Sequence, residues 1–457
     1  MERKNAWKNR TDTSALEAFA AEYRDFLDHG KTERECVAQC VQAAKDAGFS
    51  DLSDCTEQNR PLKAGDRVYV NWMDKVFLMF IIGSEDMARG MNILGAHIDS
   101  PRIDVKQNPL YEDSDLLYLD THYYGGIKKY QWVAMPLSLH GVVVKKNGER
   151  VQISIGEKES DPVFCISDLL PHLAQEQMKK DAAKIIEGED LNLIIGGRPL
   201  DGEEKDAVKA NVLKLLESEY GFEEEDFLSA ELEIVPAAHA RDMGFDRSMI
   251  LAYGHDDRVC AYPSMRAVLD YRGVPERTLC CVLTDKEEIG SVGATGMDSM
   301  YFENITAEVL ALTQPYNELT LRRCLRNSRM LSSDVSAGYD PNFASAFEKK
   351  NSAFLGRGLC FNKFTGARGK SSSNDANAEY VAEIRRVMDD ADVAFQFAEL
   401  GRVDLGGGGT IAFTCAKYGM NVIDAGVAVL NMHAPYEIIS KVDLYEAYHG
   451  YCAFLRS

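Results

Sequence analysis

From residue 258 to the C-terminus, short apolar segments alternate with segments of helical spacing, and this alternation constrains the fold more than any other feature. We expect strands at 278–285, 329–338, 358–364 and 421–435. We expect helices near 262–271, 303–313, 375–390 and 410–418. Strands that alternate with helices usually form a mostly parallel sheet with helices on both faces. The sequence therefore predicts an α/β fold with a three-layer, mostly parallel sheet.

The N-terminal part fits the same fold. Two helices are expected over 14–48, where apolar residues recur at helical spacing, and Thr32 with Glu35 has the capping-box pattern before the second helix. Three strands are then expected, at 67–72, 75–83 and 91–99.

The middle of the chain has a different pattern. From about 104 to 245, apolar and polar residues alternate as in strands, and Asn147-Gly148 predicts a hairpin turn. Two helical stretches are expected there, at 166–186 and 205–220. We therefore predict an inserted β-rich domain, 104–245, between two parts of one α/β domain, 1–103 and 246–457.

Charge and composition exclude several classes of protein. The net charge of −21, from 72 acidic and 51 basic residues, repels the phosphate backbone of nucleic acids. No run of about 18 apolar residues is present, so we expect no membrane span. The N-terminus has no apolar signal sequence, and the 11 cysteines show no CxxC spacing. We expect a cytoplasmic protein that binds neither nucleic acid nor membranes.

Histidines and carboxylates cluster where the predicted strands end, which is where open α/β sheets form their sites. These residues are His97, Asp99, Asp256, Asp257, Glu287, Glu288, Asp334 and His433. Two imidazoles and several carboxylates suit a pair of divalent ions that share one carboxylate. Such ions would also offset the repulsion between the neighbouring glutamates, one binding an ion and the other holding the attacking water.

The order of these residues resembles that of the di-zinc aminopeptidases, and in particular the M18 family, the aspartyl aminopeptidases. Three further segments resemble this family: the Gly-Gly…Trp…Leu-x-Leu-x-Gly pattern of 124–143, "LLPHLA" at 169–174, and the segment 406–433. The resemblance extends from near residue 15 to the C-terminus.

The resemblance implies two zinc ions per subunit, with cobalt or manganese as possible substitutes. It implies that the ions are bound by His97, Asp256, Glu288, Asp334 and His433. Asp256 would bridge the ions and precede a cis peptide bond, with Asp257 as the alternative bridging residue.

The same resemblance implies an aminopeptidase that acts on peptides with a free N-terminus. Water activated by the metal would attack the peptide carbonyl, with Glu287 as the general base, and Asp99 would orient His97. The inserted region would form a dimer, the building block of a homo-oligomer that is a dodecamer by family resemblance. His172, in "LLPHLA", would enter the active site of the partner subunit as a catalytic residue.

Several alternatives remain open. A related di-metal hydrolase, such as an M42 peptidase or an N-deacylase, would use similar ligands, and a catalytically inactive scaffold could share the fold. A P-loop enzyme is excluded because Phe364 stands where the motif requires glycine. Segments 132–139 and 371–381 depart from the acidic-substrate members, so we expect a broad or neutral preference for the N-terminal residue.

Overall fold

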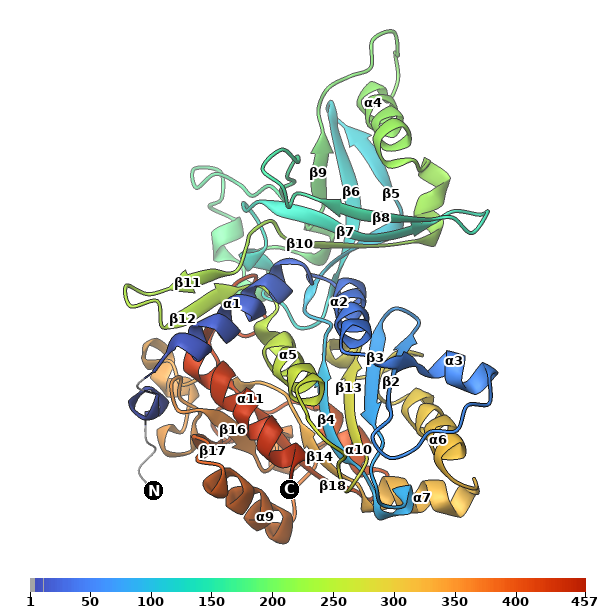
Figure 1. Cartoon of the computed structure of the whole chain (residues 1–457). Coiled ribbons are helices and arrows are strands. Elements are labelled where there is room, and N and C mark those ends of the chain that lie inside the picture. Colours follow the sequence, from blue (N-terminus) through green and yellow to red (C-terminus); the bar gives the residue numbers. More distant parts are fainter. Residues whose placement is uncertain (1–4, 11) are drawn as a thin grey trace. The chain divides into compact units, whose positions relative to one another are not determined.

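In the computed structural model, which describes residues 5–10 and 12–457, the strands expected near both ends of the chain form one nine-stranded sheet together with two strands that were not expected, Ser50–Asp51 and Phe395–Ala398 (Figure 1). In order across the sheet, its strands are β1 (Ser50–Asp51), β2 (Arg67–Trp72), β3 (Val76–Ile81), β13 (Leu279–Thr284), β4 (Asn92–His97), β14 (Arg329–Ser332), β18 (Asn421–Gly426), β16 (Leu359–Asn362) and β17 (Phe395–Ala398). Three neighbouring pairs, β2–β3, β3–β13 and β16–β18, are antiparallel. The central strands β13, β4, β14 and β18 are all parallel, so their carboxyl ends lie at one edge of the sheet.

Helices bury both faces of this sheet. On β13, Leu279, Cys281 and Leu283 contribute to one apolar cluster, and Cys280 and Val282 to the other, because successive side chains of a strand point to opposite faces. The first cluster includes residues of α1 (Ser14–Asp28), α2 (Glu33–Asp46), α5 (His255–Leu269), α9 (Ala378–Asp390) and α11 (Lys441–Leu455). The second includes residues of α3 (Leu52–Glu57), α6 (Tyr301–Thr313), α7 (Glu318–Asn327) and α10 (Ile411–Ala416). Both adjacent cysteines, Cys280 and Cys281, are therefore core residues.

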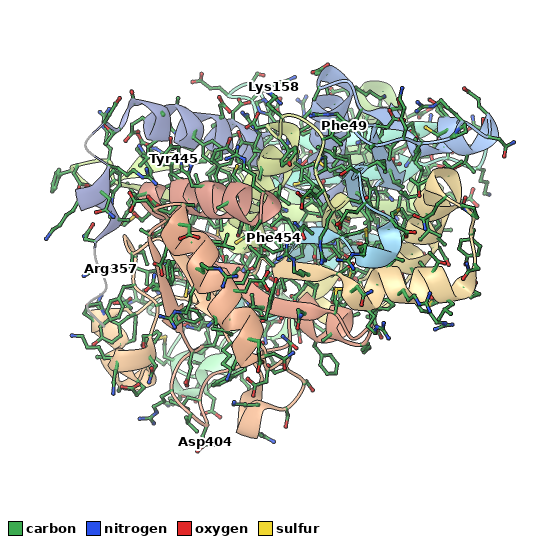
Figure 2. The ribbon with its side chains drawn as sticks, turned by 60° about the horizontal axis from the view of Figure 1, so that its bottom comes forward. Phe49, Lys158, Arg357, Asp404, Tyr445 and Phe454 are labelled. Atoms are coloured by element: carbon green, nitrogen blue, oxygen red, sulfur yellow. The ribbon has the colours of Figure 1, made fainter. Side chains whose placement is uncertain are left out.

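The two N-terminal helices form as the sequence predicts. At the start of α2, the Glu35 amide donates to Thr32 Oγ1 at 3.2 Å, and the Thr32 amide donates to Glu35 Oε2 at 3.1 Å. This capping box satisfies backbone donors that a helix start would otherwise leave without acceptors. At the other end of the chain, Phe454 of α11 is fully buried (Figure 2).

Smaller elements complete the unit that contains the large sheet. Its segments are the described residues up to Asp99, Ala240–Met432 and Glu437–Ser457. The short strands are β11 (Arg241–Met243), β12 (Met249–Ala252) and β20 (Glu437–Ser440) in one sheet, and β15 (Ser336–Ala337) and β19 (Ala428–Val429) in another. The short helix α8 (Ala367–Lys370) lies between β16 and α9.

A second compact unit comprises Ser100–His239 and His433–Tyr436. Its sheet is antiparallel throughout, and its strands in order are β8 (Arg150–Ile155), β7 (Leu137–Val144), β10 (Ala230–Pro236), β5 (Arg102–Asp113), β6 (Leu116–Tyr124) and β9 (Leu193–Gly196). The predicted hairpin at Asn147-Gly148 joins β7 to β8, and helix α4 (Ala207–Leu215) falls within the stretch expected at 205–220. The role of this region in dimerisation stays a prediction.

The helix expected over 166–186 is wrong. That segment contains only short 3₁₀ turns, Gln177–Lys179 and Ala182–Lys184. Several of its apolar side chains are exposed, with Leu173 at 68% and Met178 at 70%, although Ile166 and Ile186 are buried. A helix gains most of its stability by packing an apolar face, and only some of the apolar side chains of this segment are packed. Among the residues that the structure describes, no helix is long and apolar enough to cross a membrane.

Candidate metal centre

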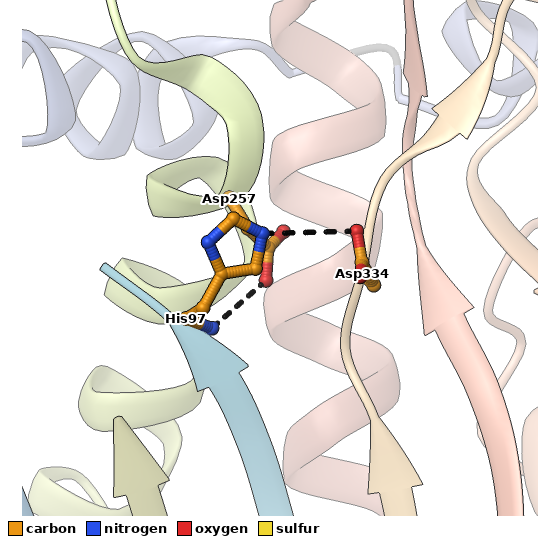
Figure 3. A group of neighbouring side chains, drawn as sticks. All are labelled: His97, Asp257 and Asp334. Atoms are coloured by element: carbon orange, nitrogen blue, oxygen red, sulfur yellow. Dashed lines mark hydrogen bonds and ion pairs between the residues drawn. The ribbon is translucent and has the colours of Figure 1, made fainter. Parts of the chain in front are cut away.

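Carboxylates from three other segments of the first unit surround His97 at the end of β4. The ligand atoms of His97, Asp257 and Asp334 all lie within 4.8 Å of one another, as do those of His97, Asp256 and Glu288. His97 Nε2 lies 3.2 Å from Asp256 Oδ1 and 4.0 Å from Asp334 Oδ1. Figure 3 shows the first of these groups, with His97 at the end of a strand, Asp334 on the segment that follows the neighbouring strand, and Asp257 on the helix. Five of the eight residues singled out in the sequence therefore form these two groups around His97.

The sheet accounts for this convergence. His97 ends β4 and lies beside Thr284, the last residue of β13, which precedes the glutamate pair by three residues. On the opposite side of β4, β14 ends two residues before Asp334. Strand β18 can lie close to the backbone of Asp334 only because Gly426 has no side chain. A Cβ atom at Gly426 would lie 1.9 Å from the Asp334 carbonyl oxygen. The ligands that follow adjacent parallel strands therefore lie together at one edge of the sheet.

The acid pair lies at the start of α5. The peptide bond between Asp256 and Asp257 is cis, as the resemblance implied. The Asp256 amide donates to Glu437 Oε2 at 2.9 Å, and the His97 amide donates to Asp257 Oδ2 at 3.4 Å. Each aspartate is therefore fixed by a contact to a distant segment of the same unit.

Asp99 contacts both His97 and the glutamate pair. His97 Nδ1 lies 3.0 Å from the Asp99 carbonyl oxygen and 3.4 Å from its Oδ1. A hydrogen bond from Nδ1 to either oxygen leaves the lone pair on Nε2, the nitrogen that faces Asp256. The carboxylate of Asp99 also accepts the amides of Glu287 and Glu288, each at 3.2 Å. This geometry is consistent with the orienting role expected for Asp99, which stays a prediction.

The site concentrates negative charge in a buried place. Burial raises the pKa of the Asp334 carboxyl, and the charge of Glu287 raises it further. Burial likewise raises the pKa of Asp257, followed by the charge of Asp334. Burial would lower the pKa of His97, but the surrounding carboxylates, led by Asp256, raise it above its usual value. A divalent cation would offset this repulsion, and imidazole nitrogen with carboxylate oxygens is a ligand set that zinc accepts, so the residues fit a zinc site.

Two predicted residues belong to the second unit. His433 Nδ1 lies 2.9 Å from the Gly126 carbonyl oxygen, in the Gly-Gly segment noted in the sequence. This contact fixes the tautomer with the lone pair on Nε2, the form that a metal ligand needs. His172 is exposed. Their roles as metal ligand and as a catalytic residue of a partner subunit remain predictions.

Two charged residues at the site had no role in the sequence interpretation, although they lie in the segments that carry the ligands. Glu437 accepts the Asp256 amide, and Arg258 directly follows Asp257 and is 1% exposed. Their positions in "NMHAPYE" and "GHDDR" were the only available signal, because burial of a charged side chain is not visible in a single sequence.

Known proteins are similar to this chain in sequence and fold. The family model described as "Aminopeptidase I zinc metalloprotease (M18)" matches residues 26–455. A probable M18 family aminopeptidase 1 from Clostridium acetobutylicum is 56% identical over 459 residues, covering 100% of this chain and 98% of that protein. The crystal structure of an M18 family aminopeptidase from Thermotoga maritima has a TM-score of 0.95 and 44% identity, covering 100% of this chain and 99% of that one.

Two further structures extend the comparison. The crystal structure of aminopeptidase I from Clostridium acetobutylicum has a TM-score of 0.92 and 55% identity, covering 100% of both chains. The Saccharomyces cerevisiae mApe1 dodecamer is 19% identical with a TM-score of 0.77, covering 96% of both chains, and at this identity it shows the fold alone. From the family model and the identities of 44% and more over the whole length, the chain belongs to the M18 family of zinc aminopeptidases, metallopeptidases that remove N-terminal residues.

Proposed function

We propose that the chain hydrolyses the first peptide bond of peptides with a free N-terminus, using two zinc ions per subunit and Glu287 as the general base. The observation that carries this proposal is the pair of three-residue ligand groups that meet at His97. The proposed ion ligands are His97, Asp256, Glu288, Asp334 and His433. Cobalt or manganese, which accept similar ligands, can take the place of zinc.

One member of the acid pair would be the ligand that bridges the two ions. Asp256 and Asp257 each belong to one of the two ligand groups, which supports placing this pair between the ions. We assign the bridge to Asp256, whose Oδ1 lies 3.2 Å from His97 Nε2, and keep Asp257 as the alternative. Asp257 would then hold the backbone of His97 through the hydrogen bond to its amide.

Bound zinc supplies a Lewis acid that lowers the pKa of water and polarises the scissile carbonyl. Glu287 removes a proton from the attacking water and returns it to the leaving amine. Its side chain is 13% exposed and its Oε2 lies 3.9 Å from His97 Nε2, so it faces the proposed ion site. The amide contact to Asp99 fixes its backbone during this proton transfer.

The proposal includes the assembly. The large sheet with its two helical faces forms a three-layer catalytic domain, and residues 104–245 form an inserted dimerisation domain. The dimer is the building block of a homo-oligomer, which is a dodecamer by family resemblance. We place the protein in the cytoplasm, where the thiols of its buried free cysteines stay reduced.

Metal removal tests the proposal. Dialysis against a chelator should abolish hydrolysis of Leu-anilide, and zinc, cobalt or manganese should restore it. Metal analysis of the restored enzyme should give two ions per subunit. Activity against N-acyl amino acids without activity against aminoacyl-anilides would favour the N-deacylase alternative, and full activity after complete metal removal would overturn the proposal.

A further inference from the structure

Arg258 is a buried arginine at the start of α5, directly after the acid pair. It is 1% exposed, and its Nε donates to the Ile98 carbonyl oxygen at 3.2 Å. The Ile98 carbonyl lies in the backbone between His97 and Asp99, so this bond holds the strand end that carries both residues. Side chains of two successive residues, Asp257 and Arg258, therefore bind the same strand end.

The guanidinium also binds a third segment. Its Nη2 donates to the Lys31 carbonyl oxygen at 3.0 Å, in the turn between α1 and α2. Because an arginine side chain has several donors in a rigid planar fork, it can hold two carbonyls from different segments at once. Arg258 thus fixes the distance between the β4 strand end and the turn that precedes α2.

Helix α1 contacts the same end of α5 independently. The hydroxyl of Tyr23 lies 2.8 Å from His255 Nδ1, and both residues are fully buried. His255 immediately precedes Asp256, so contacts from the N-terminal helices lie on either side of the acid pair. Residues that are not ligands therefore hold the segment that carries this pair in place.

We propose that Arg258 is a positioning residue that sets zinc affinity by holding the His97–Asp99 strand end against the Asp256–Asp257 pair. This inference rests on the proposed zinc site. A ligand group binds an ion well only when its members are held at the right separation, and residues that hold the ligands commonly change metal affinity 10- to 100-fold when they are replaced. Arg258 touches neither the ions nor the substrate in this role.

The test compares Arg258→Met and Arg258→Lys with the wild type and with Arg266→Met. Arg266 is a matched control because it lies on the same helix and also binds α1, through Glu22, but lies two turns beyond the acid pair. Zinc affinity is measured by competition with a chromogenic chelator. The absorption spectrum of the cobalt-substituted protein reports ligand geometry, and the melting temperature of the zinc-free protein reports stability.

We expect Arg258→Met to weaken zinc binding at least tenfold and to change the cobalt spectrum. Arg258→Lys, which keeps one donor to a carbonyl, should recover part of the affinity, and Arg266→Met should bind zinc as the wild type does. A purely structural role would lower the melting temperature of Arg258→Met without changing zinc affinity, and that result would overturn the inference.

If Arg258→Met does not fold, Arg258→Lys decides alone. Folded Arg258→Lys with wild-type zinc affinity and cobalt spectrum would overturn the inference, and weakened binding in that variant would support it. A wild-type protein that binds neither zinc nor cobalt would instead overturn the proposed function, so the two failures are distinguishable.

Discussion

The carboxylate of Asp99 accepts a hydrogen bond from the backbone amide of Glu287, with 3.2 Å between Oδ1 and the nitrogen. Its second oxygen accepts the amide of Glu288 at the same distance, and Asp99 is fully buried. One carboxylate therefore fixes the backbone of two neighbouring glutamates at the end of a buried strand. These two hydrogen bonds hold the backbone that carries both glutamate side chains in place before any ion binds.

Asp99→Asn should lower kcat for Leu-anilide by about tenfold to hundredfold while the protein stays folded. Asparagine has one acceptor oxygen, so its NH₂ group would face one of the two amide donors and leave a buried N–H without an acceptor. Asp86→Asn is the matched control, because Asp86 also accepts a backbone amide, that of Ala88, but far from the site and in an exposed loop. Wild-type kcat in Asp99→Asn would show that the contact is dispensable.

The two glutamates should respond differently to the same substitution. Glu287→Gln should keep its zinc and lose about 3–5 kcal/mol of transition-state stabilisation, the scale of a lost general base. Glu288→Gln should lose zinc affinity, because an amide is a poorer zinc ligand than a carboxylate. Metal content and kcat measured on both variants separate these roles. If Glu287→Gln turns over as the wild type does, the base is another residue.

The sequence was sufficient to predict the elements that depend on local patterns. The apolar strand that contains Leu279, Cys280 and Cys281, and the capping box of Thr32 and Glu35, depend on residues close together in the chain. The helix expected at 166–186 failed because helical spacing does not show whether a packing partner exists.

The sequence predicted only part of the candidate site, because some of its contacts depend on residues far apart in the chain. His97 and Asp334 could be grouped because parallel strands end at one edge, and the structure places them together. The bond from Arg258 to Ile98 joins residues 160 positions apart, and that from Asp256 to Glu437 joins residues 181 apart. A local sequence pattern cannot predict such contacts. The residues that hold the ligands in place, Arg258 and Glu437, are therefore recognised only in the structure.

His449 should make the protein less stable in mild acid. Burial, then the charges of Arg10 and Arg456, lower the pKa of His449 to about 4, whereas in the unfolded chain it stays near its usual value of about 6.5. Its ring lies 4.5 Å from that of Tyr445 on α11. Below about pH 6.5 the unfolded state therefore binds a proton that the folded state excludes, and stability falls as the pH drops towards 4.

His449→Gln should remove this loss. Between pH 7.5 and 5, the variant should lose less unfolding free energy than the wild type, by up to about 2 kcal/mol, in urea denaturation of the zinc-free protein. The control is His29→Gln, because the His29 side chain is 69% exposed. Equal pH dependence in the wild type and His449→Gln would contradict the assignment.

The preferred N-terminal residue should be neutral, or the preference broad. Lys370, a cation that could receive an acidic side chain, already binds Asp375 Oδ2 at 2.9 Å and lies 3.9 Å from the centre of the Phe364 ring. Its charge is offset within the loop, so kcat/KM for Asp-anilide should not exceed that for Leu-anilide. Lys370→Met should leave the ratio unchanged. A tenfold preference for Asp- or Glu-anilide would overturn this expectation.

A second subunit should complete the active site through His172. The segment around His172 exposes Leu169 at 52%, Leu170 at 50% and Leu173 at 68%. Apolar side chains gathered on one exposed segment commonly mark an interaction surface, and a second copy of this chain would bury them. There His172 could donate a hydrogen bond to the developing oxyanion, a contribution of about 3–4 kcal/mol when the donor is preorganised.

Complementation between inactive chains tests this prediction. His172→Ala and Glu287→Ala proteins should each be nearly inactive, because every site in either one lacks one of the two groups. Refolded together, they form mixed dimers in which one site has Glu287 from the first chain and His172 from the second, so activity should return. Co-refolding Glu287→Ala with Asp99→Ala is the control, because both changes affect groups of one chain's own site and the wild-type His172 is present throughout. In that mixture the chain with intact Asp99 has no base, and the chain with intact Glu287 has no Asp99, so recovery should be absent. If mixed dimers of the first pair form and stay inactive, His172 acts within its own chain or outside the site.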